Sequence, residues 1–149
     1  MTTPLAVLLV VHVLSGVVAI GMHNVALMHL LKKAPDYLFV SRLAWSALVL
    51  LVLSWATSAY YYVSYYGVAV KPRILAGDTP AAHIFFMETK EHIFLILPFL
   101  ALSIALCTVY LRSHQDDDSL RKSTAFLTLV ALAVGAATAA SGILVSGAI

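Results

Sequence analysis

The chain has 149 residues, of which 62% are hydrophobic and 11% are charged, and its formal net charge is +2. A soluble domain carries about 25% charged residues, so this composition excludes a soluble globular protein and predicts an integral membrane protein in contact with the lipid bilayer. The small net charge gives no reason to expect a nucleic-acid partner. The single cysteine, Cys107, excludes an intramolecular disulfide and argues against an iron–sulfur cluster, which needs several thiolates.

Four apolar runs, separated by short connections, make up most of the chain. One transmembrane helix needs about 20 predominantly apolar residues, and the runs cover residues 4–31, 43–66, 84–112 and 120–148. We therefore expect an all-α, polytopic membrane protein in which residues 1–149 form a single transmembrane domain, a four-helix bundle. The first run has no basic residues before it, so we expect a retained span rather than a cleaved signal peptide.

The lysines and arginines between the spans predict the orientation, because cytoplasmic loops carry an excess of them. The first and third connections hold six, namely Lys32, Lys33, Arg42, Arg112, Arg121 and Lys122. The middle connection and its flanks hold three, namely Lys71, Arg73 and Lys90. We expect the first and third loops in the cytoplasm, and both termini and the middle loop, residues 67–82, outside. The expected location is the cytoplasmic membrane of a bacterium or archaeon.

Charge is concentrated at the start of the third span, where residues 87–92 read Met-Glu-Thr-Lys-Glu-His. On a helix Glu88, Glu91 and His92 share one face, whereas Lys90 points elsewhere. Carboxylates and an imidazole at the mouth of a membrane span form a candidate ligand or proton site. The alternative is an interfacial cap, in which the glutamates complement the helix dipole.

Two histidines on different spans have the same predicted depth in the membrane. His12 lies twenty residues before Lys32, and His92 lies twenty residues before Arg112. Both spans run from outside to inside, so both imidazoles lie about 30 Å from the inner edge at 1.5 Å per residue. Two histidines at matched depth suit bis-imidazole ligation of a haem, and they also suit a transition-metal site.

The first span adds two further candidate residues. His12 and His23 are eleven residues apart and share one helix face, separated by roughly 16 Å along the axis. Gly16 lies near this face, where a missing side chain leaves room for a flat ligand. His23 is a candidate cofactor ligand or a hydrogen-bonding partner for a neighbouring helix. His83 is about half a turn out of phase with His92 and is expected to face away from it.

The fourth span contains a run of small residues, Ala-Val-Gly-Ala-Ala-Thr-Ala-Ala-Ser-Gly at positions 133–142. Small residues three or four apart let helix backbones approach closely. The run therefore predicts tight packing within the bundle, or a seam for a homo-oligomer or a larger membrane complex.

Residues 12–21, His-Val-Leu-Ser-Gly-Val-Val-Ala-Ile-Gly, resemble the opening helix of the copper-resistance D-like membrane proteins and their four-helix relatives, which include the HemJ-type haem proteins. Residues 90–95, Lys-Glu-His-Ile-Phe-Leu, are loosely similar to the start of a later helix in those relatives. The resemblance covers the first span and the start of the third. It implies a histidine ligand at His12, with His92 as the weaker match.

Three functional hypotheses follow. The leading one is a haem b between His12 and His92 near the outer leaflet, which transfers electrons to or from a quinone or a partner subunit. The second is a copper, zinc or iron ion held by His12, Glu88, Glu91 and His92 for transport or sensing. The third is a non-catalytic subunit that docks through the fourth span, with the histidines as interhelical hydrogen-bonding groups. The sequence leaves open whether the site is a catalyst or a relay.

Overall fold

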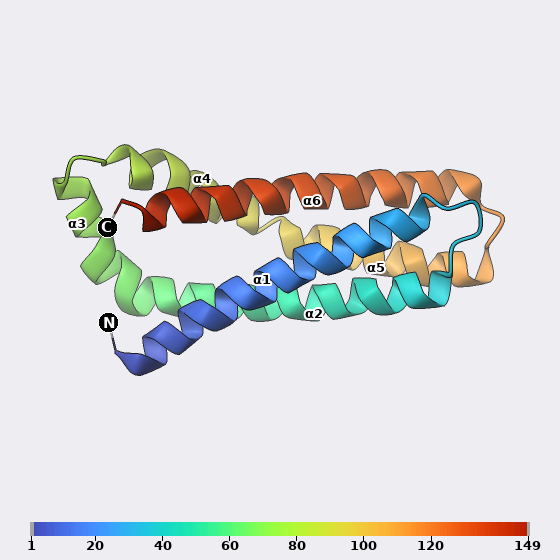
Figure 1. Cartoon of the computed structure of the whole chain (residues 1–149), viewed down its shortest axis with the longest axis horizontal. Helices are drawn as coiled ribbons and strands as arrows, with labels where there is room; N and C mark the ends of the chain where they lie inside the picture. The colour runs from blue at the N-terminus through green and yellow to red at the C-terminus, as the bar shows by residue number, and fades with distance from the viewer. Residues whose placement is uncertain (1, 149) are drawn as a thin grey trace.

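The computed structural model of the protein describes residues 2–148, and these fold into a bundle of four long helical segments. The first is α1 (Thr3–Leu30). The second runs through α2 (Tyr37–Tyr61), the π-helix η1 (Tyr62–Val70) and α3 (Lys71–Ala76). The third combines the π-helix η2 (Ala82–Met87), α4 (Glu88–Phe94) and α5 (Leu97–Ser113), and the fourth is α6 (Asp118–Ser146). The predicted all-α four-helix bundle is confirmed (Figure 1).

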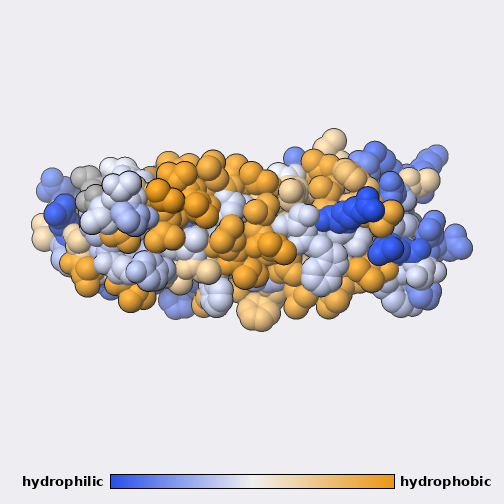
Figure 2. Space-filling model, turned by 90° about the horizontal axis from the view of Figure 1, so that it is seen from below, coloured by the Kyte–Doolittle hydropathy of each residue, from blue (hydrophilic) through white to orange (hydrophobic). Residues whose placement is uncertain are grey.

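All four segments are long and apolar enough to cross a membrane. Large apolar side chains cover much of the outer surface, for example Val49, Phe99, Phe126 and Ile143, which are each more than 60% exposed. Figure 2 shows this apolar surface along the middle of the bundle, with hydrophilic residues gathered toward the two ends. The protein is therefore a four-span integral membrane protein whose helices contact lipid.

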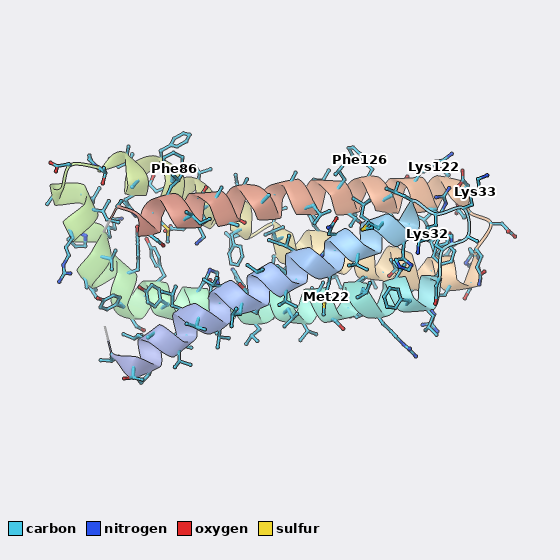
Figure 3. All side chains as sticks on the ribbon, viewed as in Figure 1. Met22, Lys32, Lys33, Phe86, Lys122 and Phe126 are labelled. Carbon is cyan, nitrogen blue, oxygen red and sulfur yellow. The ribbon has the colours of Figure 1, made fainter. Side chains whose placement is uncertain are left out.

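The connections alternate between the two ends of the bundle. α1 begins and α6 ends at the same end of the bundle as the connection at residues 77–81, whereas the connections at 31–36 and 114–117 lie at the opposite end (Figure 1). Lys32, Lys33 and Lys122 gather at this opposite end, far from Phe86 (Figure 3). The two basic connections thus share one end, as expected. Which membrane side each end faces stays a prediction.

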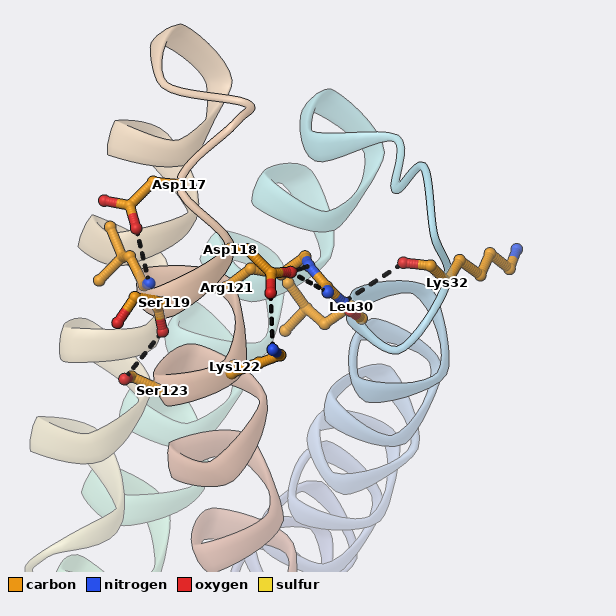
Figure 4. Close-up of polar contacts among 9 residues, drawn as sticks. Leu30, Lys32, Asp117, Asp118, Ser119, Arg121, Lys122 and Ser123 are labelled. Atoms are coloured by element: carbon orange, nitrogen blue, oxygen red, sulfur yellow. Dashed lines mark hydrogen bonds and ion pairs between the residues drawn. The ribbon is translucent and has the colours of Figure 1, made fainter.

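Charged side chains close the helix ends at the basic end of the bundle (Figure 4). Asp117 caps α6 by accepting a hydrogen bond from the backbone N–H of Leu120 at 2.9 Å. Arg121 forms an ion pair with Asp118 and donates to the carbonyl oxygen of Leu30 at 2.7 Å. That carbonyl is one of those left without a partner at the C-terminus of a helix, so Arg121 joins the end of α1 to the start of α6.

The small residues of α6 pack within the bundle. A Cβ atom at Gly135 would lie 3.0 Å from Cγ1 of Ile20, so the absence of a side chain lets α6 approach α1 closely. The buried residues of α1 form a stripe three or four residues apart, namely Ser15, Ala19, His23, Ala26 and Leu30. Gly135 and Thr138 are buried, which confirms the predicted packing at these two positions of the small-residue run, whereas five of its alanines are exposed, namely Ala133, Ala136, Ala137, Ala139 and Ala140. Oligomerisation or docking through α6 stays a prediction.

The second span is longer than the sequence predicts, because the helix continues to Ala76 instead of ending at residue 66. The middle connection shortens from residues 67–82 to residues 77–81. The backbone N–H of Lys71 bonds to the carbonyl of Tyr66 five residues earlier, the spacing of a π-helix. Pro72 then falls in the first turn of α3, where its missing N–H costs no hydrogen bond. A proline that signals a loop in the sequence is accommodated inside a helical segment.

Candidate functional site

A pocket of about 370 Å³ lies among α1, the α2–η1 segment, α4 and α6, in the half of the bundle that holds both chain ends. Its polar lining residues are His12, Ser58, Tyr61, Tyr62, Tyr66, Lys90, Glu91 and Ser146. Trp55 and Phe94 contribute aromatic walls. Val63 and Leu95 also line the pocket and are 74% and 47% exposed, so the pocket reaches the lipid-facing surface.

The imidazole of His12 is held in one orientation by α2. Its Nδ1 lies 2.9 Å from the carbonyl oxygen of Ser54 and 2.9 Å from the Ser54 hydroxyl oxygen. Because a carbonyl oxygen only accepts hydrogen bonds, Nδ1 carries the proton and Nε2 keeps its lone pair. The ring also meets the edge of Phe94, with ring centroids 5.9 Å apart. Nε2 of His12 is thus available as an acceptor or as a metal ligand.

Gly16 supports this contact and does not line the pocket. A Cβ atom at Gly16 would lie 3.3 Å from the hydroxyl oxygen of Ser54, which donates to the carbonyl of His12 at 3.0 Å. The space beside Gly16, expected to admit a flat ligand, is occupied by Ser54. Gly16 therefore permits the close approach of α1 and α2 that positions His12.

The rotation of α4 differs from the predicted one. Lys90 and Glu91 line the pocket with Phe94, whereas Glu88 and His92 are exposed. Nδ1 of His92 bonds to the carbonyl of Glu88 at 2.6 Å. Lys90 and Glu91 thus face the same pocket as two partly buried apolar side chains, Met87 at the end of η2 and Phe94 seven residues later.

The predicted ligands are therefore only partly brought together. Of His12, Glu88, Glu91 and His92, the pocket contains His12 and Glu91. Among residues 2–148, His12 alone of the histidines lines the pocket, and no group of three or more His, Cys, Asp or Glu is arranged to hold a metal ion. Bis-histidine haem ligation, and a copper, zinc or iron site made from these four residues, stay predictions.

Lys90 and Glu91 both have unused hydrogen-bonding capacity. The Lys90 ammonium lies against Gly142, where a Cβ atom would be 3.2 Å from Nζ. Within residues 2–148, Lys90 takes part in no ion pair, and the buried Oε1 of Glu91 has no hydrogen-bond partner. The Glu91 carboxylate interacts electrostatically with Lys90 and accepts a side-chain hydrogen bond from Tyr62. A buried acceptor without a donor costs free energy, which a ligand with a suitable donor would recover.

A buried tyrosine–histidine pair lies beside the pocket, with Tyr66 in the pocket wall and His83 behind it. The Tyr66 hydroxyl lies 3.0 Å from Nδ1 of His83, and the two residues are 4% and 1% exposed. Nε2 of His83 lies 3.9 Å from Oε1 of Glu88. His83 and His92 face different ways, as their phase difference predicted, because His83 is buried and His92 is exposed. His83 lies in the π-helix η2 and contacts Tyr66 of η1.

His23 does not join this site. It is 3% exposed in the bundle core, its Nδ1 bonds to the carbonyl of Ala19 at 3.0 Å, and it does not line the pocket. Its Nε2 is buried and has no hydrogen-bond partner among residues 2–148. His12 and His23 share a helix, but only His12 reaches the pocket.

The pocket residues that the sequence did not single out for the site are Tyr62, Tyr66, Lys90 and Gly142. A usable signal existed for Lys90, since the apolar residues Met87 and Phe94, three positions before it and four after it, line the same pocket. The chain matches no protein-family model, no curated protein and no solved structure. The fold and the pocket define the protein as a four-span integral membrane protein with a ligand-sized pocket that reaches the lipid-facing surface.

Proposed function

We propose that this protein is an electron-transfer component of a membrane that binds a quinone-class molecule in the pocket around His12. The observation that carries the proposal is the convergence of three polar groups with unused hydrogen-bonding capacity, on His12, Lys90 and Glu91, in a pocket with otherwise largely apolar and aromatic walls. Small-molecule sites combine such walls with a few well-placed polar groups and enclose about 300–1,000 Å³. The pocket volume of about 370 Å³ lies within this range.

The chemistry of the walls matches a flat ring that carries oxygen atoms. Trp55, Tyr62 and Phe94 offer aromatic surfaces against which such a ring can pack. Lys90 can donate a hydrogen bond to a ring oxygen, and Nε2 of His12 and the Glu91 carboxylate can accept one. Quinones dissolve in the bilayer, and the exposed rim residues Val63 and Leu95 give the pocket a route to it.

The test uses Trp55 as a reporter, because quinones quench tryptophan fluorescence on contact. In a Trp45→Phe background Trp55 is the remaining tryptophan, and titration with a short-chain ubiquinone analogue in detergent should give saturable quenching. The reciprocal Trp55→Phe protein, which keeps Trp45, should show only linear quenching from partitioning. The proposal fails if both proteins give the same linear response.

A matched lysine pair locates the binding. Lys90→Met removes a charge-assisted donor worth about 1.5–3 kcal/mol, so the affinity should fall about tenfold or more. Lys71→Met removes a lysine outside the pocket at the same end of the bundle and should leave the affinity unchanged. Equal losses in the two variants would instead indicate a general effect of surface charge.

A second candidate function is binding of a b-type haem with His12 as an axial ligand, and the contact between His12 and Ser54 favours it. A metal-bound histidine usually donates its other ring N–H to a carbonyl or carboxylate, as Nδ1 of His12 does. Lys90 is a suitable cation for a haem propionate. Since His12 alone of the histidines in residues 2–148 lines the pocket, a second protein ligand would be a group other than histidine. His92 could serve as that ligand only if α4 rotated about its axis.

Absorption spectra of the air-oxidised and dithionite-reduced protein test the haem candidate. A Soret band that shifts on reduction is expected if haem is bound, and His12→Ala should abolish it. His92→Ala is the matched control: it leaves the spectrum unchanged if His12 is the one histidine ligand and alters it if both histidines bind the iron. A flat visible spectrum in the purified protein would exclude this candidate.

A further inference from the structure

We infer that the pocket binds the hydroquinone, the reduced form of a quinone-class molecule, in preference to the oxidised quinone, with Glu91 as the residue that distinguishes them. This inference rests on the proposed quinone binding and specifies which redox form the pocket recognises. It concerns equilibrium binding and includes no electron-transfer step.

The Glu91 carboxylate has one oxygen without a donor. Its Oε1 is buried and accepts no hydrogen bond from residues 2–148, whereas Tyr62 hydrogen-bonds to the carboxylate and Lys90 attracts it electrostatically. Glu91 lines the pocket together with Lys90, Met87 and Phe94. The pocket wall therefore contains a carboxylate oxygen that lacks a donor, and buried acceptors without donors are rare.

His12 offers a second acceptor to the pocket because of where its ring proton lies. Nδ1 is the donor to the carbonyl of Ser54, so Nε2 is an acceptor and cannot donate in the neutral ring. Glu91 and His12 thus offer two acceptors to the same pocket, from α4 and from α1 respectively. Lys90, held beside Gly142, supplies a donor next to Glu91 and offsets part of its negative charge.

The two redox forms differ in the donors that they carry. A hydroquinone has two O–H groups that can donate to Glu91 and to His12, and its oxygens can still accept from Lys90. A quinone has carbonyl oxygens that only accept, so it would bring lone pairs toward Glu91 and Nε2 of His12 and leave both acceptors unpaired. A site built around particular hydrogen bonds discriminates strongly against a ligand that lacks the matching group.

The test compares the two redox forms of one short-chain ubiquinone analogue under anaerobic conditions, with binding to the detergent-solubilised Trp45→Phe protein followed by Trp55 fluorescence and by equilibrium dialysis. We expect the hydroquinone to bind about tenfold or more tightly than the quinone, which corresponds to one well-formed hydrogen bond to a charged acceptor. This comparison needs no substitution at Glu91.

Glu91→Gln then assigns the preference to its source. An amide of the same shape can donate as well as accept, so the preference for hydroquinone should fall several-fold and quinone binding should strengthen. Glu88→Gln is the matched control, because Glu88 is exposed three residues earlier on the same helix, outside the pocket lining, and the preference should not change. Dialysis of both variants also shows whether a weak fluorescence response reflects lost binding.

The outcomes separate the two proposals. Saturable binding of both forms with equal affinity would leave quinone binding intact and overturn the inference. An unchanged preference in Glu91→Gln, or an equal change in Glu88→Gln, would overturn the role given to Glu91. Absence of saturable binding for either form would overturn the proposed quinone binding, and the inference with it.

Discussion

The Nδ1 nitrogen of His12 lies 2.9 Å from the carbonyl oxygen of Ser54, in a contact that joins α1 to α2 at the wall of the pocket. The Ser54 hydroxyl completes the contact by donating to the His12 carbonyl at 3.0 Å, and Gly16 makes room for it. Ser54 is fully buried. One serine on α2 thus determines which nitrogen of His12 faces the ligand space, and this decides whether His12 acts as an acceptor, a donor or a ligand.

Replacing Ser54 by alanine should weaken the α1–α2 contact. The change removes the hydroxyl that bonds to His12 but leaves the backbone carbonyl in place, and interhelical hydrogen bonds in membrane proteins contribute about 0.6–1.7 kcal/mol. We expect a loss of this size in the free energy of unfolding, measured by denaturant titration in detergent. Ser58→Ala removes a hydroxyl that bonds within its own helix, to the carbonyl of Trp55, and should cost less. Equal losses would contradict the interhelical role of Ser54.

The buried hydrogen bond between Tyr66 and His83 should stabilise the junction of the two π-helices. Tyr66→Phe leaves Nδ1 of His83 without a partner in a buried site, which costs about 1–3 kcal/mol. Tyr65→Phe should be nearly neutral, because the Tyr65 hydroxyl forms no hydrogen bond within residues 2–148. A double-mutant cycle with His83→Phe should give a coupling free energy of about 0.5–3 kcal/mol. A coupling near zero would show that the pair contributes nothing to stability.

Substitution by valine should affect stability much more at Gly135 than at Gly21. Gly135→Val places carbon atoms against Ile20, where even a Cβ would lie 3.0 Å away, and overpacking of this kind costs about 1–3 kcal/mol. Gly21 has no atom within 4 Å of an added Cβ, so Gly21→Val should change stability by about 0.5 kcal/mol or less. Thermal unfolding of both variants in detergent measures the difference. Ile20→Ala should recover part of the loss in Gly135→Val, and failure to do so would place the strain elsewhere.

Arg121 and Lys122 carry the same charge at adjacent positions but should differ in their importance for stability. Arg121 donates to the carbonyl of Leu30 and its side chain is 17% exposed, whereas the Lys122 side chain is 72% exposed and pairs with Asp118. Arg121→Met should reduce the free energy of unfolding by about 1.5–3 kcal/mol, and Lys122→Met by about 1 kcal/mol or less. Each variant removes one positive charge, so an effect through membrane orientation alone would be the same in both.

Part of this architecture follows from local properties of the sequence. The length of an apolar run decides whether it can span the bilayer, and neighbours in sequence supply that information. The four spans, the absence of a soluble domain and the shared end of the basic connections were therefore predicted before any packing was known. The small residues around Gly135 predicted a close helix approach within the bundle or to another chain, and the structure shows that Gly135 faces Ile20 of α1.

Other features depended on contacts between segments far apart in the chain. Grouping Glu88, Glu91 and His92 by charge did not anticipate that Lys90 and Glu91 line the pocket while Glu88 and His92 are exposed. Periodicity assumes α-helical turns, so it could not anticipate two π-helices or the path of the chain through Pro72.

The sequence by itself determined that this is a four-span membrane protein and identified His12 as a candidate ligand. The tertiary structure decided which groups share a pocket with it: Lys90 and Glu91 from α4, with Ser54 orienting the ring from α2. The physical reason is that membrane insertion depends on hydropathy summed along one segment, whereas the rotation of a helix about its axis depends on the shapes of its neighbours.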